Sequence, residues 1–346
     1  MTAVLPEEST PTLDEAFARA AEVLSGADEV ALACHVNPDP DALGSMLGLS
    51  AFLRARGTAT VCSFPNEPLK LPRWASFLPG SDDLVEVADY PDAPAVMVTC
   101  DCASFDRLGP LGSAASNATE VIWIDHHRSN DGLGTIPLID PAASSTCEMV
   151  FRLIAEMGGE MPDATAACLY AGLVTDTGRF QYEATTPETL RVAAALREHP
   201  FDHARMVQAL YEDNRREYLR VEAVALARAT VDTEVDLVWT YLTQADLADA
   251  GVGPEETDDL IDLIRTVRDV DVAAVLKQRP DGRFKVSTRS RGEHDLSAIA
   301  AAFGGGGHRL AAGYTSEHGP AGTIARLVAA LRAPGAVASS GPRPGS

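Results

Sequence analysis

Each of three apolar runs, ALACH, VMVTCD and VIWIDHH, ends in an acidic or imidazole side chain. The residues at these ends, or just beyond them, are His35, Asp39, Asp41, Asp101, Asp125, His126 and His127. Because the carboxyl ends of parallel strands share one edge of a sheet, where ligands bind, strands here would bring these side chains into one cleft. An Asp after a strand is also a common helix N-cap, so capping is the competing interpretation for Asp39 or Asp101 taken alone.

A fourth acidic residue, Asp176, ends the apolar helical run LYAGLVTD, just before a glycine turn. The competing interpretation is a solvated carboxylate at a helix end. The helix dipole, however, disfavours an acid at a C-terminus, which favours a further role such as metal ligation.

The combined ligand set contains no thiolate and consists of His35, Asp39, Asp41, Asp101, His126 and Asp176. Carboxylates with imidazoles suit Mn²⁺ and, less specifically, Mg²⁺, Fe²⁺ or Co²⁺. Four crowded carboxylates would repel one another without metal, whereas two divalent cations balance their charge. Two such ions, about 3.5–4 Å apart, activate a water and stabilise an in-line phosphoryl displacement. The pattern therefore predicts metal-assisted phosphoester hydrolysis.

The elements that must position these residues alternate between strands and helices. The N-terminal part reads as helix over 13–24 and 42–57, strand over 29–35, 58–64, 95–101 and 120–127, and helices over 144–176 and 186–229. This alternation predicts an α/β fold with a doubly wound, mainly parallel sheet. Further on, strands are expected near 236–242, 271–278 and 283–289, with helices near 255–268, 295–303 and 321–332. We expect a second, smaller α/β domain there that closes over the cleft.

The predicted organisation has four parts. Residues 12–195 form the domain that holds the metals, 196–215 a helical linker, 216–335 the substrate-binding domain and 336–346 a disordered Pro/Gly/Ser-rich tail.

Composition restricts the class of protein. The net charge of −22 over 346 residues argues against a surface for long duplex nucleic acid, although metals and a few arginines still permit a short anionic ligand. The apolar stretches fall far short of the roughly 20 residues that span a bilayer. The start, MTAVLPEEST, lacks the features of a secretory signal, and six scattered cysteines favour a reduced core, so we expect a cytoplasmic protein.

Four segments, HVNPDPDALGS, VTCDCASFDRLG, IDHHRSN and GLVTDTGRF, resemble the motifs of the DHH phosphoesterase superfamily, in the right order. The downstream SRGEHDLSAIAAAFGGGGHRLAAGY resembles the signature of that family's associated C-terminal domain. The resemblance covers about residues 12–335 and is greatest to the nanoRNA phosphodiesterase (NrnA-like) group. Members of that group are bifunctional oligoribonucleases and 3′-phosphoadenosine 5′-phosphate (pAp) phosphatases, and some act on cyclic di-AMP.

The resemblance implies a role for each motif residue. One Mn²⁺ would lie on His35, Asp39 and Asp101, and the second on Asp41, Asp101, His126 and Asp176. Asp101 would bridge the two. His127 would face the substrate phosphate, orienting it or donating a proton to the leaving group, and Asp125 would fix a histidine tautomer.

In the C-terminal half, the run Gly304–Gly307 precedes His308 and follows the strand-like FKVSTRS. A glycine run alone is often only a flexible loop. Here we expect the backbone N–H groups of Gly305, Gly306 and Gly307 to approach an anion, helped by an adjacent helix N-terminus. As the resemblance implies, Arg289 and His308 would then contact a terminal phosphate or base.

The prediction is an Mn-dependent enzyme that hydrolyses dinucleotides such as pApA and pGpG, other short oligoribonucleotides, pAp and, as a further candidate, cyclic di-AMP to nucleoside monophosphates, using water activated by two metals. The resemblance also implies a homodimer.

A family II inorganic pyrophosphatase is the nearest rival; it presents an Arg-Lys-Lys cluster, whereas Lys277 and Lys285 are far apart in this sequence. A non-catalytic nucleotide sensor is the rival from another class, and the complete ligand set argues against it. The preferred substrate, cleavage polarity, physiological metal and oligomeric state stay open.

Overall fold

The computed structural model describes residues 11–130 and 132–333, so the predicted disordered tail at 336–346 lies outside the described residues. The chain divides into two compact units, Met1–Glu212 and Asp213–Ser346. The narrower boundaries expected from the sequence, at 195 and 215, remain predictions.

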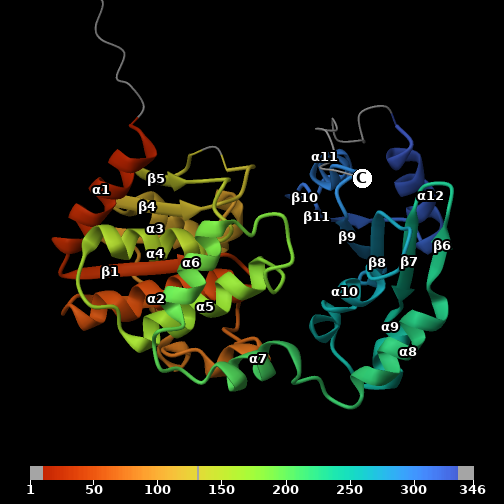
Figure 1. Ribbon diagram of the computed structural model, residues 1–346, viewed down its shortest axis with the longest axis horizontal. Helices are drawn as coiled ribbons and strands as arrows, with labels where there is room; N and C mark the ends of the chain where they lie inside the picture. Colours follow the sequence, from red (N-terminus) through yellow and green to blue (C-terminus); the bar gives the residue numbers. More distant parts are fainter. Residues whose placement is uncertain (1–10, 131, 334–346) are drawn as a thin grey trace, which may run out of the picture. The chain divides into compact units, whose positions relative to one another are not determined.

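The first unit is built on a parallel five-stranded sheet with the order β2-β1-β3-β4-β5 (Figure 1). Its strands are β1 (Glu29–Cys34), β2 (Ala59–Ser63), β3 (Val96–Cys100), β4 (Glu120–Asp125) and β5 (Ile136–Ile139). Alternate residues of the central strands enter two hydrophobic clusters: Leu32 joins one, and Ala31 and Ala33 join the other. Both faces are therefore buried, which confirms the predicted doubly wound α/β fold.

Helices cover both faces of this sheet. They are α1 (Leu13–Ser25), α2 (Pro40–Ala55), α3 (Gly112–Asn117), α4 (Thr146–Met157), α5 (Asp163–Asp176), α6 (Pro187–Leu196) and α7 (His203–Tyr211). Short 3₁₀ segments lie at Arg73–Phe77, Ser81–Asp83, Val87–Asp89 and Phe105–Leu111. Helices α1, α2, α4 and α5 contribute to the larger cluster and α3 to the smaller one.

Helix α2 is buried on nearly all sides because glycines let its neighbours come close. A Cβ on Gly44 would lie 2.5 Å from the carbonyl oxygen of Cys168, in α5. A Cβ on Gly172 would lie 2.3 Å from Cys147 Sγ and 2.8 Å from the Cα of Asp41. These contacts bring the start of α2, the start of α4 and the last turns of α5 together.

All six cysteines are free, buried and part of the first unit, which confirms their expected place in the core. They are Cys34, Cys62, Cys100, Cys102, Cys147 and Cys168.

The second unit contains a six-stranded sheet with the order β10-β11-β9-β8-β7-β6, in which only β7 and β8 pair in parallel. The strands are β6 (Thr230–Asp232), β7 (Leu237–Leu242), β8 (Val272–Gln278), β9 (Phe284–Ser290), β10 (Gly306–His308) and β11 (Ala311–Ser316). The helices are α8 (Tyr218–Arg228), α9 (Gln244–Ala250), α10 (Leu260–Ile264), α11 (Leu296–Ala302) and α12 (Pro320–Leu331), with a 3₁₀ segment at Pro254–Thr257.

The two faces of this second sheet pack against different helices. Helices α11 and α12 cover the face with Val272, Ala274 and Leu276, and α8 to α10 cover the face with Ala273 and Val275. Among the residues described, no helix combines the length and the apolar character needed to cross a membrane.

Candidate active site

The three motif-bearing strands, β1, β3 and β4, are neighbours in the first sheet, so their carboxyl ends share one edge, as predicted. His35 follows β1, Asp101 follows β3, and Asp125 ends β4. Asp101 leaves the strand in the left-handed region, with φ of 56°, a conformation that Asp tolerates better than most residues. Its N–H donates to the carbonyl of Ile124, 2.9 Å away, which fixes the carboxylate at the edge.

A first group of possible ligands is formed by His35, Asp39 and Asp101. His35 Nε2 lies 3.4 Å from Asp101 Oδ2 and 3.9 Å from Asp39 Oδ2. Asp39 is also the N-cap of α2, because its other oxygen, Oδ1, accepts from the N–H groups of Asp41 and Ala42. Capping and ligation are therefore compatible, since they use different oxygens.

A second group is formed by Asp41, Asp101 and His126. His126 Nε2 lies 3.7 Å from Asp101 Oδ1, 3.8 Å from Asp41 Oδ2 and 3.3 Å from Oδ2 of Asp176, the last residue of α5. His126 Nδ1 donates to the carbonyl of Ala143, 3.2 Å away, so Nε2 is the ring nitrogen that faces the carboxylates and could bind a cation.

Burial and mutual repulsion dominate the electrostatics of these carboxylates. Burial raises the pKa of Asp41 well above its usual value, and the charges of Asp101 and Asp176 raise it further. Burial opposes ionisation of Asp101 too, but the hydrogen bond to His35 and the charges of the nearby histidines hold its pKa well below the usual range. The two groups share Asp101, which offers one oxygen to each.

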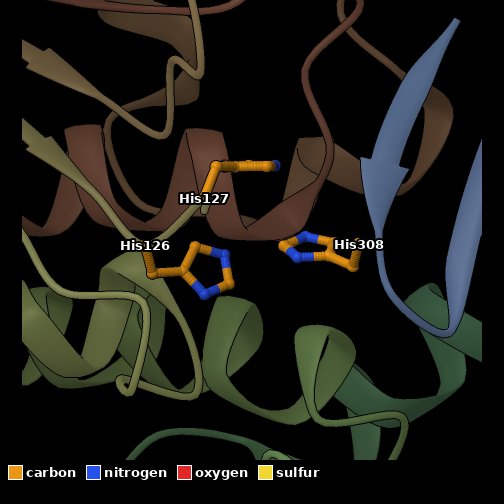
Figure 2. Close-up of side chains that lie close together, drawn as sticks. All are labelled: His126, His127 and His308. Carbon is orange, nitrogen blue, oxygen red and sulfur yellow. The ribbon is translucent and has the colours of Figure 1, made fainter. Parts of the chain in front are cut away.

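His127 is oriented by the fully buried carboxylate of Asp125. Its Nδ1 donates to Asp125 Oδ1 at 2.7 Å, while Asn130 donates to the other oxygen at the same distance. The rings of His126 and His127 stand at 68° with centroids 5.1 Å apart, and Figure 2 shows the two side chains leaving adjacent positions in different directions. Burial would lower the pKa of His127, but the hydrogen bond to Asp125 and the charge of Asp101 outweigh it and raise the pKa to about 9.

Three residues that the sequence did not single out support these side chains. Asn130 also donates to the carbonyl of Cys102, and Arg107 places a guanidinium nitrogen 2.9 Å from His35 Nδ1. Thr146 contacts both Asp41 and Asp101. The available signal for Thr146 was the sequence SST at the start of an apolar helical run, a typical N-cap pattern.

The donor set fits divalent cations. It combines carboxylate oxygens with imidazole nitrogens, contains no thiolate, and its buried carboxylates gain compensation from a bound positive charge.

In the second unit, the structure places two predicted substrate contacts in one row across the sheet. His308 pairs with Ala311, Ala311 with Arg289, and Arg289 with Ala273. Paired residues point to the same face, so Arg289 and His308 share a face, two strands or about 10 Å apart. Within the described residues, Arg289 Nε is buried without a hydrogen-bond partner, whereas Nη1 donates to the carbonyl of Thr288.

A helix N-terminus lies beside the far end of the glycine segment, because the N–H of Leu296, the first residue of α11, donates to the carbonyl of Arg309 at 2.8 Å. Gly304, with φ of 76°, follows the C-terminus of α11, and Gly305 N–H donates to the carbonyl of Ala300. A Cβ on Gly305 would lie 2.1 Å from the Gly313 carbonyl oxygen, and one on Gly307 would lie 2.6 Å from that of Ala311. These two glycines permit close packing of β10 on β11. Gly306 is exposed, and it alone of the three has open space where a Cβ would lie.

Lys277 and Lys285, which are far apart in the sequence, are neighbours in the fold. Antiparallel pairing of β8 and β9 puts the two lysines directly opposite each other. Lys277 is nevertheless buried and ion-paired with Asp258, and Lys285 Nζ lies 3.6 Å from the same carboxylate. Both lysines therefore contact the exposed carboxylate of Asp258, whereas the cluster of a pyrophosphatase would be presented to a ligand.

A buried carboxylate organises the segment that follows Arg289. Asp271 accepts hydrogen bonds from Ser290 Oγ, from the N–H groups of Arg291 and Glu293, and from His294 Nδ1 at 2.7 Å. Sequence reasoning missed this network because its members are about 20 residues apart.

Comparison with known proteins agrees with the geometry. Residues 29–173 match the model of the DHH family, N-terminal domain, and residues 235–333 match that of the DHHA1 domain. The bifunctional oligoribonuclease and PAP phosphatase NrnA of Thermus thermophilus is 36% identical over 296 residues, which is 85% of this chain and 86% of that protein. The protein of the same name from Bacillus subtilis is 29% identical, over 83% of this chain and 88% of its own.

Among solved structures, an exopolyphosphatase-related protein from Bacteroides fragilis aligns with a TM-score of 0.83 and 25% identity, covering 92% of this chain and 96% of that one. The order of the motifs, the two domain matches and the extent of these similarities lead to one assignment. The chain belongs to the DHH family and carries a DHHA1 domain after its DHH domain.

Proposed function

We propose that this protein is a metal-dependent phosphoesterase that hydrolyses short oligoribonucleotides and pAp to nucleoside monophosphates. The observation that carries the proposal is the position of Asp101, whose two oxygens face two separate groups of possible ligands. The names of the relatives from Thermus thermophilus and Bacillus subtilis support this substrate class.

Two divalent ions, with Mn²⁺ as the first choice, are the proposed cofactors. His35, Asp39 and Asp101 would hold one, and Asp41, Asp101, His126 and Asp176 the other. When bound, such ions neutralise phosphate charge and make a water nucleophilic at neutral pH.

The chain's own residues supply orientation and a proton. The hydrogen bond to Asp125, which keeps Nδ1 engaged, raises the pKa of His127 to about 9 and so favours a proton on the ring at neutral pH. The proton on Nε2 is therefore available for a phosphate oxygen or for the leaving group, which makes His127 the proposed general acid.

For substrate binding, Arg289 and His308 are the proposed phosphate contacts. The N–H groups of Gly306 and Gly307 are weaker candidates, whereas the N–H of Gly305 already donates to the carbonyl of Ala300. The protein's net charge of −22 repels a long polyanion wherever it extends beyond Arg289 and His308. We therefore favour short substrates. A homodimer and a cytoplasmic location remain predictions.

The test is product analysis by chromatography after incubation with Mn²⁺. The panel contains pApA, a 5-mer and a 24-mer RNA, pAp, cyclic di-AMP and pyrophosphate, with Asp101→Ala as the inactive control. AMP from the short substrates, absent with the variant, is the expected result. Phosphate from pyrophosphate alone would transfer the assignment to a pyrophosphatase, and nucleotide binding without any turnover would favour a sensor.

A further inference from the structure

Thr146 contacts Asp41 and Asp101, the two acids of the second ligand group. We propose that it is a positioning residue that fixes Asp41 and Asp101 for the cation held by Asp41, Asp101 and His126. The inference rests on the proposed metal centre and assigns a separate role to a residue that is not itself a proposed ligand.

The contacts of Thr146 use both its backbone and its side chain. Its N–H donates to Asp41 Oδ2 at 2.7 Å, and the next N–H, of Cys147, donates to Asp41 Oδ1 at 2.9 Å. The Thr146 hydroxyl donates to Asp101 Oδ1 at 2.9 Å. Thr146 is fully buried, so water does not replace any of these bonds.

The position of Thr146 in α4 explains why these donors are available. The first N–H groups of a helix have no partner inside it. Ser145 is the N-cap, and its side chain takes the N–H of Glu148, which leaves those of Thr146 and Cys147 directed at Asp41. The helix dipole adds a favourable interaction with that carboxylate.

The geometry also predicts that Thr146 acts on one ion more than on the other. Its hydroxyl holds Oδ1 of Asp101, the oxygen that lies 3.7 Å from His126 Nε2. The other oxygen, Oδ2, faces His35. Loss of the hydroxyl therefore frees the carboxylate mainly on the side of the second group.

Substitution by valine tests this, because valine keeps the volume and the branched Cβ but removes the donor. The protein would be titrated with Mn²⁺ by calorimetry as wild type, Thr146→Val, Thr146→Ser and Thr165→Val. Thr165 is a matched control: it is also fully buried, and its hydroxyl donates to the carbonyl of Gly48, in the body of α2. We expect Thr146→Val to weaken one of two Mn²⁺ sites by about tenfold or more and the other by less than about threefold. Thr146→Ser should restore most of the affinity, and Thr165→Val should bind as wild type does.

The outcomes separate this inference from the proposed function. If the wild type binds no pair of Mn²⁺ ions, the metal centre itself is wrong. If the wild type binds two and Thr146→Val binds both equally well, only the role of Thr146 is wrong. Equal weakening of both sites by Thr146→Val and Thr165→Val would also overturn it, because that pattern reports general loosening of the unit. Should the valine variant not fold, Thr146→Ala carries the same expectation.

Discussion

The two units place their candidate functional side chains by different structural means. In the first, the side chains follow the ends of parallel strands, and each is held by at least one further contact, as Asp125 holds His127. In the second, Arg289 and His308 lie within or at the end of antiparallel strands and share a face because of strand pairing. The first arrangement gathers a group of acids of which Asp41, Asp101 and Asp125 are buried, and the second places Arg289 and His308 on one face of a sheet. Under the proposed function, the first unit would carry the chemistry and the second would contribute substrate affinity.

The strongest test of this division is Asp101→Asn. Asn tolerates the left-handed conformation at this position, so the fold should survive. Loss of the carboxylate shared by both ligand groups should lower kcat for pAp by roughly a thousandfold or more, since each ion supplies several kcal/mol. Steady-state kinetics with Asp82→Asn as an exposed control would measure it. A variant that retains a tenth of the activity would contradict the shared role.

A second test removes the positive charge of Arg289 in the second unit. Arg289→Gln should raise KM for pAp by about 10–100-fold and change kcat by only a few fold, because a charge-assisted contact to a phosphate is lost. Arg283→Gln is the matched control, since Arg283 is exposed and pairs with Asp281 near the start of the same strand. A fall in kcat without a change in KM would show that Arg289 belongs to the chemistry, and the comparison would need revision.

The third test uses the raised pKa values of Asp41 and His35. Both groups must lose a proton before they ligate a cation, so Mn²⁺ binding should release protons and weaken as pH falls. Below these pKa values, affinity should drop by about tenfold or more for each pH unit. Calorimetry in two buffers with different ionisation heats counts the protons. Identical heats in both buffers between pH 5.5 and 7 would refute the linkage.

The smallest expected effect concerns the stability of the second unit. Hydrogen bonds from Arg228 and the cap at Thr243 lower the pKa of Asp246 to about 2, while the unfolded chain has an Asp pKa of about 3.9. A lowered pKa stabilises the fold above pH 4, and the contribution is lost as pH falls towards 2. With solvent screening of a carboxylate that is 14% exposed, we expect about 1 kcal/mol.

This last prediction is checked by urea denaturation of wild type and Asp246→Asn. Hydrogen exchange of peptides that cover β7 and α9 serves to detect unfolding of the second unit. The difference between the two proteins should shrink between pH 5 and pH 2. A difference that stays constant over this range would mean that the carboxylate contributes nothing through its charge. Asp281→Asn, on an exposed pair, is the control.

Much of the first unit was predictable because buried parallel strands are continuous apolar runs, and the polar residue after each marks the shared edge. The strands β5, β6, β10 and β11 were not predicted, because they are short or rich in glycine and alanine. Contacts such as that of Thr146 with Asp101 join residues 45 positions apart, which no local pattern reveals. The pairing of Lys277 with Lys285 depends on strand register, which the sequence separation concealed.

The distribution of the cysteines has a practical consequence for following the two units separately. All six thiols are buried in the first unit, and the sequence has no cysteine beyond Cys168. A thiol reagent therefore reacts only when the first unit opens, whatever the second unit does. The rate of labelling in native buffer therefore measures how often the first unit opens. If Mn²⁺ slows the labelling, binding of the cation stabilises the core of this unit.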